Sequence, residues 1–179
     1  IDVLKRNGVN PALCTLICGG AEVGNALAES RHVDLLSFTG STPVGRIVAQ
    51  KVQSRFGRSL LECGGNNAII VMPDADLDMA VRSVLFAAVG TAGQRCTTCR
   101  RLILHTDIHD DFVQRLTKAY DQVRIGDQLQ DGTLMGPLHR PEAVQAFTGL
   151  VNKIQSDPAC KIVYGGQVLD GNYVQPTIA

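Results

Sequence analysis

One stretch of the sequence combines a cysteine with several arginines. Cys96 lies next to Arg95, and two further arginines, Arg100 and Arg101, follow closely. Gly93, just upstream, lets the backbone bend closely around a ligand. A cationic neighbourhood favours thiolate over thiol, and the thiolate is the form that attacks electrophiles. These residue types therefore predict that Cys96 is a nucleophile.

A second stretch places one carboxylate in apolar surroundings. Glu62 lies between Leu61 and Cys63 and is followed by Gly64 and Gly65. Desolvation by such neighbours would make the carboxylate a stronger base, able to activate water. A cysteine that attacks and a glutamate that activates water together predict a two-step covalent reaction.

Other readings of Cys96 are a buried structural cysteine or one half of a C-x-x-C pair with Cys99. The pair could be redox-active or form part of a zinc site, but zinc needs two more ligands. Cys14 and Cys18 could supply them only if the fold brought them close, so no metal site is predicted. A Cys-His protease also lacks local support. The four histidines are scattered along the chain at His32, His105, His109 and His139.

Composition excludes several classes of protein. The 179 residues contain 17 basic and 17 acidic side chains, so the net charge is zero, and no basic stripe predicts nucleic acid as a partner. No apolar run reaches the length of a membrane span. Six cysteines are too few for a secreted disulfide scaffold, and a reducing compartment, the cytosol or the mitochondrial matrix, is expected. The chain starts without Met and is interpreted as an internal segment of a longer protein.

The first third of the chain predicts alternating strands and helices. An apolar run at 12–18 predicts a buried strand, 21–30 a short helix and 33–38 a second buried strand. A glycine-containing loop at 39–45 then leads into a helix that reaches residue 56. This alternation is typical of a doubly wound α/β sheet.

The loop at 39–45 has features of a phosphate-binding helix start. Thr42 is expected to cap the helix, and Pro43 suits the first helical position. Gly40 and Gly45 allow a ligand to approach the backbone, and free N–H groups at a helix start attract phosphate. An ordinary capped helix is the competing interpretation, because the loop is neither a P-loop nor a G-x-G-x-x-G fingerprint.

The remainder continues as a mixture of helices and strands, with a domain boundary predicted at Gly64 and Gly65. Helices are expected after the turn at 73–76, at 108–123 and at 142–155. Short strands are expected at 59–62, 67–72, 101–105, 161–164 and 173–178.

Three motifs in this order resemble the aldehyde dehydrogenase superfamily. They are Phe-Thr-Gly-Ser-Thr-Pro-Val-Gly at 38–45, Leu-Glu-Cys-Gly-Gly-Asn at 61–66 and Gly-Gln-Arg-Cys at 93–96. The resemblance covers essentially the whole chain. The Asn-Asn pair at 66–67 and the sequence at 90–98 are similar to the antiquitin branch, the α-aminoadipic semialdehyde dehydrogenases of lysine catabolism.

The resemblance implies a fold and a reaction. Residues 1–64 would be the C-terminal part of an NAD-binding domain with a partial Rossmann-type sheet, and 65–179 the N-terminal part of an α/β catalytic domain. Cys96 matches the family nucleophile, which forms a thiohemiacetal and, after hydride transfer to NAD⁺, a thioester. Glu62 matches the general base that activates the hydrolytic water, and the Cys96 N–H matches an oxyanion donor.

The resemblance also implies binding roles. Arg95 would hold the distal carboxylate of a semialdehyde substrate, and Thr97 would line the substrate site. Gly24 and Asn25 match a turn near the adenine end of the cofactor. The other implied cofactor-binding residues are Gly40, Ser41, Thr42, Gly45, Glu62, Cys63 and Gly64.

The chain lacks some family features and departs from others. A second oxyanion donor, two ribose-binding residues and the strand used for assembly lie outside it, although the full-length protein would form a homotetramer. Cys63 and Cys99 stand where relatives commonly carry Leu and a small residue. The alternative to an enzyme is therefore a catalytically incomplete segment that acts only as a partial or interaction chain. Acylating enzymes of the superfamily that use phosphate or CoA remain a further alternative, which Glu62 disfavours.

Overall fold

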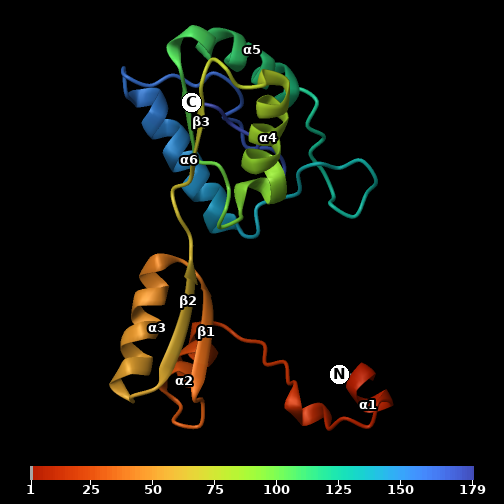
Figure 1. Ribbon diagram of the computed structural model, residues 1–179, viewed down its shortest axis with the longest axis vertical. Coiled ribbons are helices and arrows are strands. Elements are labelled where there is room, and N and C mark those ends of the chain that lie inside the picture. Colours follow the sequence, from red (N-terminus) through yellow and green to blue (C-terminus); the bar gives the residue numbers. More distant parts are fainter. Residues whose placement is uncertain (1) are drawn as a thin grey trace. The chain divides into compact units, whose positions relative to one another are not determined.

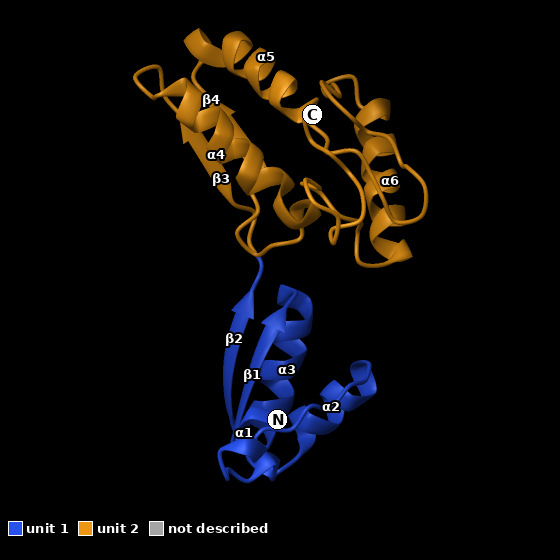
Figure 2. Cartoon of the chain, turned by 90° about the vertical axis from the view of Figure 1, so that its right-hand side faces the viewer, with its two compact units in different colours: residues 1–64 blue, residues 65–179 orange. Residues whose placement is uncertain are grey.

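The chain forms two compact units in the computed structural model, which describes residues 2–179. The first unit ends at Gly64 and the second is Gly65–Ala179 (Figure 2). This division falls where the sequence places a domain boundary. The assignment of the units to a cofactor-binding and a catalytic domain remains a prediction.

The first unit is built around two parallel strands (Figure 1). Strand β1 (Leu35–Gly40) pairs in parallel with β2 (Arg58–Cys63) in continuous register. Helix α3 (Thr42–Ser54) connects the two strands and packs on both. Parallel neighbours need such a crossover, so this β-α-β arrangement confirms the predicted α/β class. The remaining helices are α1 (Asp2–Arg6), the 3-10 helix η1 (Pro11–Leu13) and α2 (Ala21–Glu29).

Helix α2 is joined to the end of α3 by packing and by one side chain. Val52 of α3 and Ala28 of α2 are buried. Arg55, just after α3, donates from Nε to the carbonyl oxygen of Ala28 at 2.8 Å. This bond satisfies a carbonyl at the end of α2, where helices leave acceptors unpaired.

The predicted strand at 12–18 is wrong. These residues form the end of η1 followed by irregular backbone, and Leu13, Leu16 and Ile17 are 78%, 80% and 62% exposed. An apolar run has a preference for burial, but a strand also needs a neighbouring strand and a covering layer. In the described part of the first unit, β1 and β2 pair only with each other.

The second unit combines another parallel strand pair with three longer helices. Strand β3 (Ala68–Val71) pairs in parallel with β4 (Arg101–Leu104). The helices are α4 (Leu77–Val89), α5 (His109–Tyr120) and α6 (Pro141–Ser156). Short 3-10 helices, η2 (Gly90–Gly93) and η3 (Thr106–Ile108), follow α4 and precede α5.

Helices α4 and α5 form the core of this unit because their apolar residues recur at helical spacing. The side chain of Asp76 caps α4 by accepting from the Met79 N–H at 3.0 Å. Val84 on α4 and Phe112 and Leu116 on α5 are almost fully buried. The predicted helices at these positions are therefore confirmed, with ends that differ by a few residues.

The two strands predicted near the end of the chain are wrong. Residues 161–164 and 173–178 contribute only single antiparallel bridges, Tyr164 with Ile178 and Val168 with Val174. A ladder needs several consecutive paired residues, and the glycine turns at 165–166 and 171 leave room for only isolated bonds.

Among residues 2–179, each helix lacks the combination of length and apolar character needed to cross a membrane.

Buried Tyr120 should make the stability of the second unit depend on pH in the alkaline range. It is 4% exposed, and its ring meets that of Tyr164 edge-on at 5.5 Å. Burial, with a smaller effect of the charge of Cys99, raises the pKa of Tyr120 from 10.0 to about 12. In the unfolded chain the pKa of Tyr120 is about 10, so between about pH 10 and 12 only the unfolded state loses this proton. The folded state is therefore fully stable with respect to this group below about pH 10, and the free energy of unfolding falls as pH rises towards about 12. We expect a loss of about 2–3 kcal/mol in the free energy of unfolding over this window.

Urea unfolding at several alkaline pH values measures this loss. The difference in phenolate absorbance between the unsubstituted chain and Tyr120→Phe gives the titration of Tyr120, one of three tyrosines. The matched variant Tyr120→Phe keeps the ring and removes the ionisable group. It should flatten the pH dependence, and an unchanged slope in this variant would assign the effect to another group.

Candidate active site

The carboxyl ends of β1 and β2 bring together most of the predicted cofactor-binding residues. Gly40 is the register partner of Cys63, and Thr39 is the partner of Glu62. Gly64 follows directly. Ligands of open α/β sheets bind at this edge of parallel strands. Within the first unit, the structure therefore groups these residues at one edge.

The start of α3 lies at the same edge and differs by one residue from the prediction. Ser41, and not Thr42, is the N-cap residue, with extended backbone at φ −73° and ψ 147°. Thr42 is the first helical residue and Pro43 the second. Among the described residues, the Ser41 side chain caps no helical N–H. The hydroxyl of Ser41 and the first N–H groups of this helix are thus available to an anion.

Gly45 makes the close approach between α3 and β2 possible. It is buried in the first turn of α3, and a Cβ atom at this position would lie 2.8 Å from the Cys63 sulfur. Real Cβ atoms do not approach other atoms so closely, so a larger residue would require the Cys63 side chain or α3 to shift.

Replacing Gly45 by alanine should destabilise the first unit by about 1 kcal/mol. Alanine gains up to about 1 kcal/mol of helix propensity, but the overlap with Cys63 costs about 1–3 kcal/mol. Combining Gly45→Ala with Cys63→Ala should remove the penalty, and a double-mutant cycle by urea unfolding measures the coupling.

Gly24→Ala is the matched control for this cycle, since Gly24 also lies in a helix but a Cβ there meets nothing within 4 Å. It should be neutral or stabilising. Equal effects of Gly45→Ala with and without Cys63 would contradict the predicted overlap.

Two predicted cofactor residues lie elsewhere in the first unit. Gly24 and Asn25 are exposed residues inside α2, so the predicted turn at this position is wrong. The run from Ala21 to Glu29 contains strong helix formers, and one interior glycine costs only about 1 kcal/mol. Their role near an adenine group stays a prediction.

Glu62 is exposed at the end of β2. The sequence predicts a desolvated carboxylate from its apolar neighbours, but successive side chains of a strand point to opposite faces. Leu61 and Cys63 therefore do not cover Glu62. Its carboxylate lies open at the edge that carries the other predicted cofactor residues.

In the second unit, Cys96 lies at the tip of a closed turn. The Thr98 N–H donates to the Arg95 carbonyl oxygen at 3.2 Å, and the Arg95 N–H donates to the Thr98 hydroxyl oxygen at 3.1 Å. Thr98 is 4% exposed and anchors the turn, whereas Cys96 and Thr97 are exposed. Within residues 2–179, no atom accepts a hydrogen bond from the N–H of Cys96 or Thr97.

The backbone that leads into this turn is unusual. Thr91, Ala92 and Gly93 are consecutive residues with φ values of 56°, 53° and 69°. Left-handed backbone is costly for Thr and Ala, and such strain concentrates at functional sites. The glycine predicted to permit a bend is thus the last of three left-handed residues.

The side chain of Arg95 turns back onto α4. Its guanidinium donates to the Phe86 carbonyl oxygen and lies 4.6 Å from the centre of the Phe86 ring. Gly90 leaves the space for it, because a Cβ there would overlap the guanidinium. Arg95 therefore closes the end of α4 here, and holding a substrate would require another rotamer.

Gln94 connects the cysteine segment to a distant loop, which the sequence did not indicate. Its Nε2 donates to the carbonyl oxygens of Thr91 at 3.1 Å and Pro137 at 3.3 Å. Its Oε1 accepts from the His139 N–H and lies 3.0 Å from His139 Nδ1. The two segments are 45 residues apart, so no local pattern could reveal the contact.

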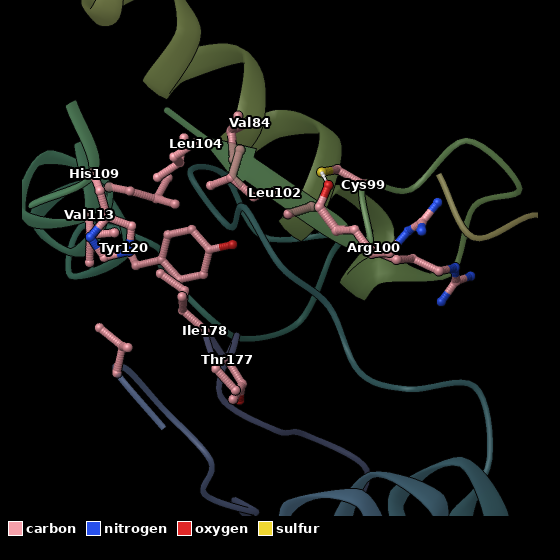
Figure 3. Close-up of a pocket in the computed structure, with 15 residues that line it drawn as sticks. Val84, Cys99, Arg100, Leu102, Leu104, His109, Val113, Tyr120, Thr177 and Ile178 are labelled. Atoms are coloured by element: carbon pink, nitrogen blue, oxygen red, sulfur yellow. Dashed lines mark hydrogen bonds between the residues drawn. The ribbon is translucent and has the colours of Figure 1, made fainter. Parts of the chain in front are cut away.

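Cys99 is half-buried and lines a cavity of about 470 Å³ that Tyr120 also lines (Figure 3). Burial raises the pKa of the Cys99 thiol, and its sulfur lies 3.4 Å from the Arg101 carbonyl oxygen. All six cysteines are free thiols. Across residues 2–179, no three His, Cys, Asp or Glu side chains gather as metal ligands.

Apart from Gly24 and Asn25 in α2, the predicted site residues thus fall into two groups. Gly40, Ser41, Thr42, Gly45 and Glu62–Gly64 lie together in the first unit. Arg95, Cys96 and Thr97 lie together in the second. The proposed base and the proposed nucleophile belong to different units, each described by itself.

The whole chain matches the family model described as the aldehyde dehydrogenase family, over residues 1–179. It is 58% identical to the α-aminoadipic semialdehyde dehydrogenase of Bos taurus over 178 residues, which is 98% of the chain and 33% of that relative. It is 54% identical to aldehyde dehydrogenase family 7 member A1 of Pisum sativum, covering 99% of the chain and 35% of the relative.

The chain is also similar to solved structures. An NADP-dependent enzyme of E. coli superposes with a TM-score of 0.92 at 35% identity, covering 98% of the chain and 37% of that structure. A betaine aldehyde dehydrogenase of Staphylococcus aureus in complex with NAD⁺ gives 0.84 at 28% identity, covering 90% and 33%. The chain spans about a third of the length of these relatives. It belongs to the aldehyde dehydrogenase family.

Proposed function

We propose that the protein containing this chain oxidises an aldehyde to a carboxylic acid with NAD⁺ as the hydride acceptor. The observation that carries the proposal is the turn at 95–98, which presents an exposed Cys96 thiol beside two unbonded N–H groups. Covalent catalysis at a carbonyl needs this combination of a nucleophile and donors for the developing oxyanion.

Each step can be assigned to residues of this chain. The Cys96 thiolate attacks the aldehyde carbon, and the Cys96 N–H donates to the oxyanion of the thiohemiacetal. The carboxyl edge of the first unit would hold NAD⁺, which would supply the hydride acceptor. Loss of hydride from the carbon bound to the Cys96 sulfur would leave a thioester on Cys96. Glu62 then removes a proton from the water that attacks the thioester, which frees the acid and restores Cys96.

The carboxyl edge of the first unit supports the cofactor proposal. The free start of α3 at Ser41 and Thr42 suits a pyrophosphate, and Gly40 and Gly45 leave the backbone accessible. Glu62, Cys63 and Gly64 at the neighbouring strand end would contact the nicotinamide. Gly24 and Asn25 of α2 would lie towards the adenine.

The proposed substrate is a semialdehyde that carries a distal carboxylate, such as α-aminoadipic semialdehyde. The names of the most similar relatives support it. Arg95 would bind the carboxylate through its guanidinium, after leaving the Phe86 carbonyl, and Thr97 would line the site. The full protein would be a homo-oligomer, and its thiol nucleophile suits the cytosol or the mitochondrial matrix.

The chain covers about a third of the length of its relatives, which supports a second proposal for the chain alone. By itself it should turn over aldehyde negligibly, because elements that complete the family's site lie outside it. Appreciable NADH formation by the 179-residue chain would refute this.

Thiol alkylation followed by mass spectrometry tests the proposed site. We expect Cys96 to be labelled faster than Cys160, which is also exposed, because N–H donors at the turn stabilise negative charge. NAD⁺ should change the rate at Cys63, which lies at the proposed cofactor edge. Equal rates at Cys96 and Cys160 and no response to NAD⁺ would contradict the proposed function.

A further inference from the structure

The nucleophile turn is held by one side chain that lies 29 residues upstream. Asn67 donates from Nδ2 to the carbonyl oxygen of Cys96 at 2.6 Å and to that of Thr98 at 3.0 Å. An amide NH₂ group has two hydrogens, so both can be used at once. The two carbonyls on one side of the turn are thereby fixed by a single group.

The backbone of Asn67 holds the segment that follows the turn. Its carbonyl oxygen accepts from the N–H groups of Arg100 at 3.0 Å and Arg101 at 3.1 Å. Asn67 directly precedes β3, and Arg101 begins β4, its parallel neighbour. Through its backbone and its side chain, Asn67 therefore links the β3–β4 strand pair to the turn that carries Cys96.

Fixing these carbonyls also fixes the donors. The C=O and N–H of a trans peptide point in opposite directions, so a Cys96 carbonyl bound by Asn67 directs the Thr97 N–H to the other side of the turn. The Arg95 carbonyl, bound by the Thr98 N–H, likewise directs the Cys96 N–H outward. Both free N–H groups owe their orientation to bonds on the far side of the same peptides.

We propose that Asn67 is a positioning residue for the nucleophile: it orients the Cys96–Thr97 peptide so that its N–H, with that of Cys96, can stabilise negative charge developing at the turn. The proposal rests on the proposed function, since it takes Cys96 as the nucleophile. In this role Asn67 acts through the backbone of the turn, by binding the carbonyl oxygens of Cys96 and Thr98.

The adjacent Asn66 provides a matched control. It is exposed, and within residues 2–179 its side chain makes no hydrogen bond, while its carbonyl oxygen accepts from Arg101 Nε. Asn67→Asp keeps the shape of the side chain but replaces both donors by acceptors that face two carbonyls. Asn66→Asp makes the same change of charge one residue away.

Alkylation rates of Cys96, Cys99 and Cys160 in the same sample test the proposal. Cys160 is an exposed internal reference, and half-buried Cys99 reports opening of the fold. We expect Asn67→Asp to lower the ratio of Cys96 to Cys160 labelling about five- to tenfold, on the scale of lost charge-assisted hydrogen bonds, with Cys99 still protected. Asn66→Asp should change the ratio less than about twofold, and Asn67→Leu, without added charge, should reproduce most of the Asn67→Asp effect.

Equal ratios in the Asn66 and Asn67 variants would overturn the proposal. Faster labelling of Cys99 in Asn67→Leu would also overturn it, because Asn67 would then be a purely structural residue. Failure of the proposed function is a separate result, seen in the unsubstituted chain as equal labelling of Cys96 and Cys160.

Discussion

Replacing Cys96 by serine should lower NAD⁺-dependent aldehyde oxidation by the protein that contains this chain by a factor on the order of 10³ or more. A serine hydroxyl at an exposed turn is almost fully protonated at neutral pH and is a poor nucleophile without an adjacent base. Within residues 2–179, no histidine forms a hydrogen bond with Cys96, so a hydroxyl there would lack an adjacent base. Absorbance of NADH gives the rate, and mass spectrometry detects covalent adducts.

Cys160→Ser is the control for this substitution. Cys160 is also an exposed free thiol of the second unit, so the control removes a thiol of the same kind without touching the turn. It should keep the full rate. Substantial activity in Cys96→Ser, or an acyl adduct on another cysteine, would remove Cys96 from the proposed mechanism.

Replacing Glu62 by glutamine should separate the two halves of the reaction. The attack by Cys96 and the hydride transfer need no base at Glu62, so one equivalent of NADH should form in a burst. Hydrolysis of the thioester should then slow by about 10²–10⁴, the usual contribution of general base catalysis. Stopped-flow absorbance measures the burst, and intact mass spectrometry should find the acyl group on Cys96.

Glu142→Gln is the matched control, since Glu142 lies in the first turn of α6 and is exposed. It should leave both phases unchanged. If Glu62→Gln lost the burst together with the steady-state rate, Glu62 would act before the thioester forms. If the unsubstituted protein required phosphate or CoA for turnover, an acylating reaction would replace hydrolysis.

The longer helices and the strands β1–β4 could be predicted as separate elements because their signals are local, whereas the pairing of these strands came from the structure. Apolar residues at helical spacing marked α4 and α5, and Asp76 marked the start of α4. The observed ends of β1 and the observed start of α3 differ from the predicted ones by one or two residues. For α3 the reason is that several neighbouring residues can cap a helix. The same local chemistry marked Cys96 and Glu62 as candidates.

Predictions that required a distant partner failed or could not be made. The run at 12–18 and the segments at 161–164 and 173–178 have strand-like composition, but strands exist only through pairing. Similarly, apolar neighbours did not bury Glu62, because burial depends on what faces the side chain across the fold.

The family is indicated by the resemblance of three sequence motifs, at 38–45, 61–66 and 93–96, to the aldehyde dehydrogenases. The residue types by themselves indicate candidates for a thiol nucleophile, a carboxylate base and a phosphate-binding helix start. How the proposed nucleophile is held could be known only from the folded second unit. There Asn67 binds the Cys96 carbonyl, Gln94 meets His139, and Arg95 turns onto Phe86. The physical reason is that these hydrogen bonds join segments whose separation in sequence leaves no periodic or local trace, and only the packing of β3, β4 and α4 brings them within bonding distance.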